Sequence, residues 1–84
     1  MTGPVVIATL AKNSRERVRI ALDNYRGHDL VDLRVVVQLT EATGIWTPTA
    51  KGISLRVDLL PDLIKALQEA ELEAKQLGLI GRAA

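Results

Sequence analysis

Two stretches of this sequence alternate polar and apolar residues with a period of two, which restricts them to β-strands. Over residues 17–22, one side of the predicted strand carries Arg17, Arg19 and Ala21, and the other side is apolar throughout. From 30 to 37, every odd-numbered residue is apolar, whereas Asp32 and Arg34 share the other side. An extended chain places successive side chains on opposite faces of a sheet. The sequence therefore predicts two half-buried strands joined by a turn at residues 24–28.

Two further strands are predicted from shorter signals on either side of this pair. Residues 5–11 form a β-prone apolar run before Arg17. Residues 41–44 are typical of a turn, and residues 46–57 then predict the last strand. Pro48 and Gly52 interrupt that strand, which favours an edge position or an irregular hairpin arm.

Residues beyond the last strand have the periodicity of one long helix. Asp58 is expected to cap its N-terminus, Pro61 to lie in its first turn and Gly78 to end it. Its apolar stripe is wider than the roughly 100° that packing on one surface needs. Because 84 residues leave much apolar surface uncovered, we expect the helix to meet its own copy in a homodimer. The predicted dimer interface consists of Leu60, Leu63, Ile64 and Leu67.

The predicted fold class is α+β, with a four-stranded antiparallel sheet followed by one long C-terminal helix, in the order ββββα. The sequence shows no constellation suited to catalysis: it has one histidine, no cysteine and no glycine-rich phosphate-binding motif. It therefore predicts a protein that is not an enzyme and holds no metal or cofactor. The apolar run at 5–11 is too short to span a bilayer and follows no basic segment, so we expect a cytoplasmic protein without membrane partners.

Charge is distributed unevenly along the chain. Residues 1–56 carry eight Lys or Arg and five Asp or Glu, a net charge of +3. Residues 57–84 carry three and five, a net charge of −2. Arg17, Arg19 and Arg34 are expected to add positive charge to the outer faces of the strands. This asymmetry is compatible with a basic surface and an acidic surface on opposite sides.

The two aromatic residues lie near cations. Tyr25 precedes Arg26 in the predicted turn, and Trp46 lies five residues before Lys51. Bases stack on aromatic rings with little sequence preference while cations follow the phosphates, so this pattern indicates single-stranded nucleic acid. In the alternative interpretation, Trp46 covers the hydrophobic core and Tyr25 fills a hairpin corner.

The segment 48–55, which includes Lys51-Gly52-Ile53-Ser54-Leu55 and precedes an amphipathic helix, resembles the positive cofactor four family of transcriptional coactivators. Residues 24–27 are similar to the family's turn of polar, aromatic, basic and glycine residues, and residues 30–34 to its next strand. The resemblance covers residues 16–75. It implies a homodimer joined through helices, single-stranded DNA binding along the sheets, and a role in transcription or DNA maintenance.

The resemblance also implies the DNA contacts, which fall on Tyr25, Arg26, His28, Arg34, Lys51 and Gly52. His28 replaces a lysine of the family, and Val37 stands where the eukaryotic coactivators carry a tryptophan. We add Trp46 to the predicted site as a replacement platform for that missing ring.

The predicted division has three parts. Residues 1–15 are an N-terminal segment with the first strand, residues 16–78 are a coactivator-like single-stranded DNA-binding domain, and residues 79–84 are a tail. The predicted function is sequence-tolerant binding of single-stranded or melted DNA in the regulation of transcription. Transcription machinery is a further predicted partner. If the source is bacterial, we expect the protein to associate with the nucleoid. RNA binding and a protein–protein adaptor role are the alternatives.

Overall fold

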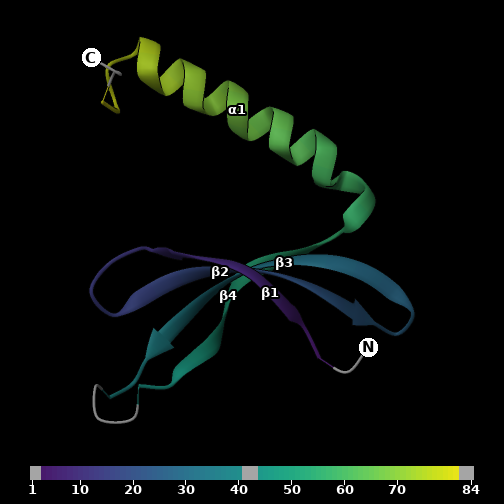
Figure 1. The fold of residues 1–84 in the computed structure, drawn as a ribbon. Coiled ribbons are helices and arrows are strands. Elements are labelled where there is room, and N and C mark those ends of the chain that lie inside the picture. The colour runs from purple at the N-terminus through teal and green to yellow at the C-terminus, as the bar shows by residue number, and fades with distance from the viewer. Residues whose placement is uncertain (1–2, 41–43, 82–84) are drawn as a thin grey trace.

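The computed structural model describes residues 3–40 and 44–81, and its elements follow the predicted order ββββα (Figure 1). A 3-10 turn, Val57–Leu59, connects the last strand to the helix. The predicted turn at 41–44 lies outside the described residues except for Gly44. The elements are β1 (Val5–Ala11), β2 (Glu16–Tyr25), β3 (His28–Gln38), β4 (Trp46–Arg56) and α1 (Leu60–Gln76).

The four strands form one antiparallel sheet in the order β1-β2-β3-β4. The pairing of β2 with β3 is regular from Glu16↔Val37 to Tyr25↔His28. Arg26 and Gly27 join these strands with φ angles of 51° and 82°, as a two-residue type I′ turn requires. The predicted segment 1–15 contributes β1 to this same sheet, and β4 is an edge strand, as its proline suggested.

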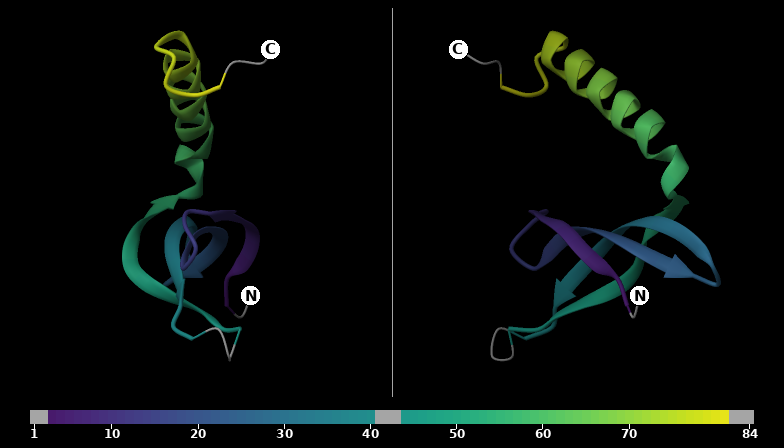
Figure 2. Two further views of the ribbon diagram at one scale, coloured as in Figure 1. Left: turned by 90° about the vertical axis from the view of Figure 1, so that its left-hand side faces the viewer. Right: turned by 45° about the vertical axis from the view of Figure 1, so that its right-hand side comes forward.

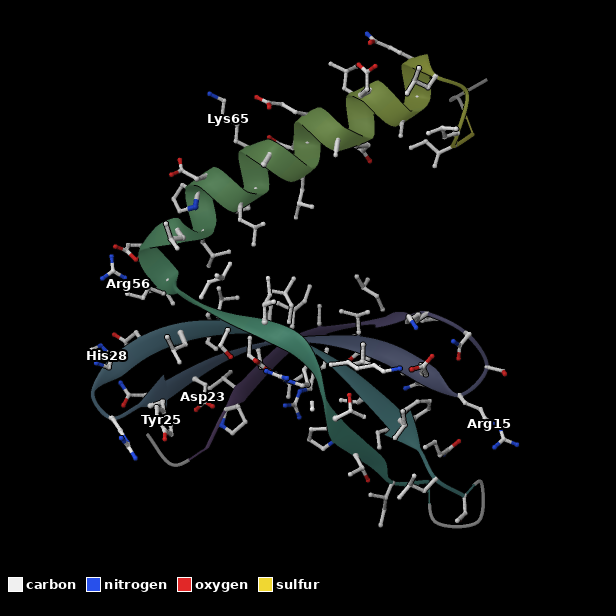
Figure 3. All side chains as sticks on the ribbon, turned by 180° about the vertical axis from the view of Figure 1, so that it is seen from behind. Arg15, Asp23, Tyr25, His28, Arg56 and Lys65 are labelled. Atoms are coloured by element: carbon white, nitrogen blue, oxygen red, sulfur yellow. The ribbon has the colours of Figure 1, made fainter. Side chains whose placement is uncertain are left out.

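The register divides the side chains between two faces, because residues opposite each other in an antiparallel pair share a face. We call the side turned toward α1 the apolar face; it includes Val18, Ile20, Leu22, Val31, Leu33, Val35 and Ile53. We call the other side the polar face; it includes Arg17, Arg19, Asp32, Arg34, Trp46 and Ser54. Figure 3 shows Asp23 and Tyr25, which follow the same alternation as Arg17 and Arg19, on the side away from α1.

The prediction that Asp58 caps the helix is wrong. Helical geometry begins one residue earlier, at Val57, so Asp58 lies inside the 3-10 turn. Its carboxylate accepts a hydrogen bond from Arg56 Nη2 at 3.1 Å, and Leu59 occupies the N-cap position of α1 without a side-chain bond. Pro61 lies in the first turn of α1, as predicted, where its missing N–H is not needed.

The end of α1 agrees with the sequence-based expectation. Gly78 follows the last turn with a φ of 74°. The Leu79 N–H donates to the Ala74 carbonyl at 2.8 Å, and the Gly78 N–H donates to the Lys75 carbonyl at 3.1 Å. This pair of bonds is a Schellman motif, in which glycine adopts the left-handed conformation at low cost.

The core of the single chain is small. In the described parts of the chain, the buried apolar residues are Ala21, Val31 and Val36, and α1 contributes none. The helix projects away from the sheet (Figure 2), and none of its residues is buried against it. Leu67 remains 56% exposed and Ile53 52% exposed. The chain therefore presents an apolar stripe on the helix and an apolar sheet face that its own residues leave largely uncovered.

Candidate nucleic-acid interface

The centre of the polar face holds an ordered network around the carboxylate of Asp32. Arg34 donates to it from Nη2 at 2.7 Å and from Nε at 3.3 Å, and the Ser54 hydroxyl donates at 2.7 Å. Arg34 also donates from Nη1 to the Thr49 carbonyl at 3.3 Å. The hydrogen bond from Arg34 lowers the pKa of Asp32 despite its burial, with Ser54 adding to the effect. These hydrogen bonds tie β3 and β4 together across the polar face.

Gly52 makes room for this network. It lies opposite Arg34 in the register of β3 and β4. A Cβ at position 52 would overlap the carbonyl oxygen of Leu33 and would lie 3.0 Å from both Cα and Cζ of Arg34. The glycine is therefore required by the close approach of the neighbouring strand and by the guanidinium that folds over it.

Arg19 lies directly opposite Arg34 on the same face, but its environment differs. Its Nη2 is 4.0 Å from Asp32 Oδ2, which is an ion-pair distance but too long for a hydrogen bond. Its Nε is the one side-chain nitrogen or oxygen of the described chain that is buried without a hydrogen-bond partner. Both arginines therefore lie within ion-pair distance of the Asp32 carboxylate, but of the two only Arg34 forms hydrogen bonds with it.

Each aromatic ring is paired with a guanidinium. The Cζ of Arg17 lies 4.0 Å from the ring centroid of Trp46, and that of Arg26 lies 5.1 Å from the ring centroid of Tyr25. Both distances are within cation–π range. Trp46 pairs with Gln38 and so lies on the polar face. Val37 is the next residue along β3 and belongs to the apolar face, so Trp46 does not occupy the side that a ring at Val37 would.

The predicted site residues occupy three regions. Tyr25, Arg26 and His28 are exposed at the β2–β3 hairpin, and Arg34 and Gly52 lie in the middle of the polar face. Trp46 lies beyond them at the start of β4, and Lys51 is exposed one residue before Gly52. The pKa of Glu16 is lowered by hydrogen bonds from Asn13 and Lys12, with a smaller contribution from the charge of Lys51. Lys51 therefore lies near enough to Glu16, the residue paired with Val37, to influence its pKa.

Sequence reasoning did not assign Asp32, Ser54 or Arg19 to the site. The spacing of Asp32 and Arg34, two residues apart on a strand, could have indicated an ion pair on one face, which the structure contains. Ser54 reaches Asp32 from 22 positions away, and that contact requires the register of β3 and β4.

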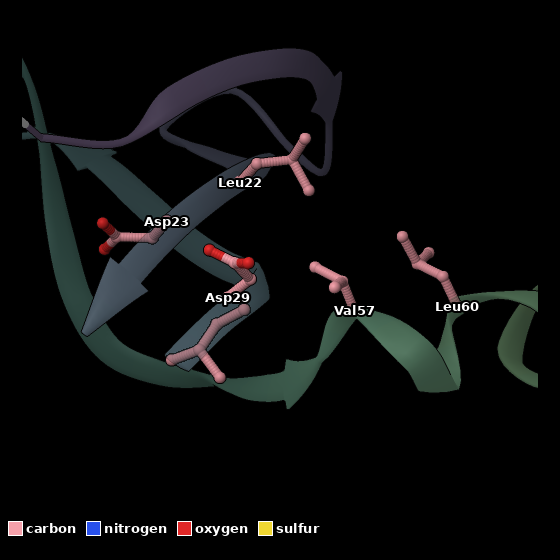
Figure 4. Close-up of a pocket in the computed structure, with 6 residues that line it drawn as sticks. Leu22, Asp23, Asp29, Val57 and Leu60 are labelled. Carbon is pink, nitrogen blue, oxygen red and sulfur yellow. The ribbon is translucent and has the colours of Figure 1, made fainter. Parts of the chain in front are cut away.

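An open pocket of about 370 Å³ lies where the sheet meets the start of α1 (Figure 4). Leu22 and Leu30 of the sheet, with Val57 and Leu60, form its apolar wall, and two aspartates complete the lining. Leu60 was predicted for the dimer interface, and the structure places it beside half-buried sheet residues. Of the other predicted interface residues, Leu63 is half-buried, and Ile64 and Leu67 are exposed.

The described residues contain no group of three or more His, Cys, Asp or Glu side chains that could hold a metal ion. Across ranges 3–40 and 44–81, no helix is long and apolar enough to cross a bilayer.

The fold is a four-stranded antiparallel sheet followed by a C-terminal helix, and the polar face of the sheet is cationic. These features define the class of proteins with which the chain is compared. Residues 12–66 match the model of the family described as Transcriptional Coactivator p15 (PC4). The match covers more than half of the chain, which therefore belongs to the PC4 family. The family assignment predicted from the sequence is confirmed.

Several solved structures resemble this chain. The crystal structure of a PC4 homolog from Burkholderia pseudomallei K96243 is 38% identical, covers 82% of this chain and 98% of its own, and has a TM-score of 0.73. A bacteriophage T5 homolog of PC4, implicated in recombination-dependent DNA replication, is 23% identical, with coverages of 92% and 86% and a TM-score of 0.66. MoSub1, solved in complex with DNA, is 21% identical, with coverages of 92% and 90% and a TM-score of 0.60. At these lower identities the last two show the shared fold alone, and a search of curated proteins gives no significant match.

Proposed function

We propose that this chain is a non-catalytic protein that binds single-stranded DNA with little sequence preference. The observation that carries the proposal is the polar face, where two arginine–aromatic pairs lie on either side of a central pair of arginines. Aromatic rings offer stacking surfaces to any base, and guanidinium groups bind phosphate oxygens. Neither kind of contact depends on the identity of the base, so the binding should tolerate many sequences.

The relatives support the same proposal. MoSub1 was solved with DNA and, in a second structure, with single-stranded DNA, and the bacteriophage T5 homolog is implicated in DNA replication. The family description names a transcriptional coactivator. A role at melted DNA, in transcription or in DNA maintenance, is therefore the setting we propose. RNA remains the alternative ligand, because stacking surfaces do not distinguish the sugars without a contact to the 2′-hydroxyl.

The apolar side of the molecule supports a homodimer as the binding unit. Ile64 and Leu67 of α1 are at least half exposed, and the apolar face beneath α1 is incompletely covered. Covering such surface stabilises a protein by roughly 25 cal/mol per Å² of apolar area removed from water. A second copy would cover the helix and leave the polar face free. A protein–protein adaptor role would use this same apolar surface for a different protein.

The test is fluorescence polarisation with labelled single-stranded DNA, duplex DNA and RNA of the same sequence over a range of salt concentrations. The test variant carries Arg26→Asn and Lys51→Gln, because asparagine tolerates the positive φ of position 26. Its control carries Lys65→Gln and Lys75→Gln on α1; Figure 3 shows Lys65 pointing away from the sheet. We leave Arg34 unchanged because it holds the Asp32 network together.

We expect wild type to prefer the single strand over the duplex. The slope of log K against log salt should flatten by about 1.4 in the test variant, since each phosphate contact contributes roughly 0.7. The control should keep the wild-type slope. If wild type binds no oligonucleotide at moderate salt but co-purifies with a defined protein, the adaptor role replaces this proposal.

A further inference from the structure

The structure gives the two central arginines of the polar face unequal roles. Arg19 and Arg34 lie directly opposite each other on neighbouring strands. Like charges in that position repel and destabilise a sheet unless something compensates for them. The side chain of Asp32 lies between them, but one carboxylate balances only one of the two positive charges. A net positive charge therefore remains at the centre of the face.

Arg34 is the partner that Asp32 balances. Its Nε and Nη2 both donate to the carboxylate, and its Nη1 donates to the Thr49 carbonyl. Ser54 donates to the same Asp32 oxygen that receives Nη2 of Arg34. All three nitrogens of the Arg34 guanidinium are engaged inside the protein, so moving Arg34 toward a ligand would break bonds on two strands.

Arg19 has no comparable attachment. Its guanidinium is 4.0 Å from Asp32, and its Nε is buried without a partner. A buried donor without an acceptor is unfavourable, so this side chain can turn outward without losing a hydrogen bond. Its side chain is 22% exposed, which gives it a route to solvent. Thr9 of β1 lies opposite it, and Arg17 lies two residues along β2 on the same face.

We infer that Arg19 binds a phosphate oxyanion of a nucleic-acid backbone at the centre of the polar face, while Arg34 is a structural residue that holds Asp32. The inference rests on the proposed single-stranded DNA binding and names the residue that contacts the backbone. A guanidinium that turns outward can present two parallel N–H groups to a phosphate, with the Thr9 hydroxyl as an additional donor. Arg34 belongs to the site that the family resemblance implies, and Arg19 does not.

The experiment compares single-charge variants in the same polarisation assay with an oligothymidylate. Arg19→Gln removes the proposed contact, and Arg19→Lys keeps its charge. Arg56→Gln is the matched control, because Arg56 is also on the sheet but is 69% exposed and paired with Asp58. We expect Arg19→Gln to flatten the salt slope by about 0.7, so that raising salt from 50 to 200 mM costs it about 2.6-fold less affinity than wild type. Arg19→Lys and Arg56→Gln should keep a slope near that of wild type.

A second measurement follows the Arg19 Nε–H resonance by NMR during titration with the oligothymidylate and, separately, with inorganic phosphate. We expect the resonance to shift when the oligonucleotide is added. If inorganic phosphate at the same concentration of phosphate groups causes a shift of equal size, Arg19 is a free-anion site and the assignment to the nucleic-acid backbone is overturned. If wild type binds the oligonucleotide and Arg19→Gln matches Arg56→Gln in affinity and slope, the role of Arg19 is wrong and the proposed function stands. If wild type binds no oligonucleotide, both fall together.

Discussion

Replacement of Asp32 by asparagine tests whether the polar face is held together by one carboxylate. The side chain of Asp32 is only 13% exposed and accepts three hydrogen bonds, two from Arg34 and one from Ser54. Asparagine has nearly the same shape but carries no charge and has one acceptor oxygen instead of two. Its amide NH₂ would face a donor nitrogen of Arg34 or the Ser54 hydroxyl, so at least one of the three bonds is lost.

The expected magnitude follows from these contacts. A hydrogen bond to a charged group contributes about 1.5–3 kcal/mol to the free energy of unfolding. The Arg34 side chain is 20% exposed, so water can replace part of what it loses. We therefore expect Asp32→Asn to lower the free energy of unfolding by about 2 kcal/mol, toward the lower end of that range. In a domain of this size, 1 kcal/mol corresponds to about 4–8 °C, so the melting temperature should fall by roughly 8–16 °C.

The assay is thermal unfolding followed by far-ultraviolet circular dichroism, with all variants at one chain concentration because a dimer melts in a concentration-dependent way. Asp23→Asn is the control: the carboxylate of Asp23 accepts a hydrogen bond from the neighbouring Asn24 N–H at 2.8 Å, which asparagine can also accept. Ser54→Ala removes a single bond and should give a smaller loss than Asp32→Asn. If Asp32→Asn melts within about 2 °C of wild type, the network does not stabilise the fold as argued.

Four further predictions concern the sheet and the helix. The pKa of folded Asp32 is lowered below its ordinary 3.8, so ionised Asp32 contributes fully to the free energy of unfolding above that pH. This contribution is lost as the pH falls through the lower pKa of the folded state. Between pH 5 and 3, the melting temperature of wild type should therefore fall by more than that of Asp32→Asn. Gly52→Ala should destabilise the protein by about 1–3 kcal/mol, measured by urea unfolding, because its Cβ meets the Leu33 carbonyl. Trp46→Ala should weaken oligonucleotide binding by about 1–3 kcal/mol if the ring stacks on a base, whereas a lower melting temperature with unchanged affinity would make it a packing residue. Leu67→Asp should convert the proposed dimer into monomers in analytical ultracentrifugation, and a wild type that sediments as a monomer would refute the dimer.

The sheet could be predicted from the sequence because its central strands alternate with a period of two over most of their length. The regular pairing from Glu16↔Val37 to Tyr25↔His28 follows from that alternation together with Gly27 in the turn. The start of the helix could not be predicted in the same way. Asp58 fits an N-cap by residue type, but the chain enters a 3-10 turn at Val57, and local composition alone does not reveal that earlier start.

The candidate site was less accessible to sequence reasoning because its contacts cross strands. The pairing of Arg17 with Trp46 joins residues from β2 and β4, which are not neighbours in the sheet, and it depends on the register of both intervening pairs. The pattern predicted that Arg17, Arg19 and Arg34 carry charge on the strand faces, and the register places all three on one face. Alternation does not show which arginine is engaged internally, because that depends on where Ser54 and Thr49 of β4 lie.

The two faces of the sheet have opposite requirements, and this separates assembly from ligand binding. On the polar face, Asp32 accepts hydrogen bonds from Arg34 and Ser54, which hold Arg34 in place while the face remains exposed to water. The apolar face and α1 lack such internal partners, and exposed apolar surface of this kind is costly to leave in water. A copy of the chain that packs against α1 would remove that cost without covering Arg19 or Trp46, which point away from it. A dimer built in this way would present two polar faces. One long single strand that reaches both faces would bind more tightly than two short single strands, because its second contact is intramolecular.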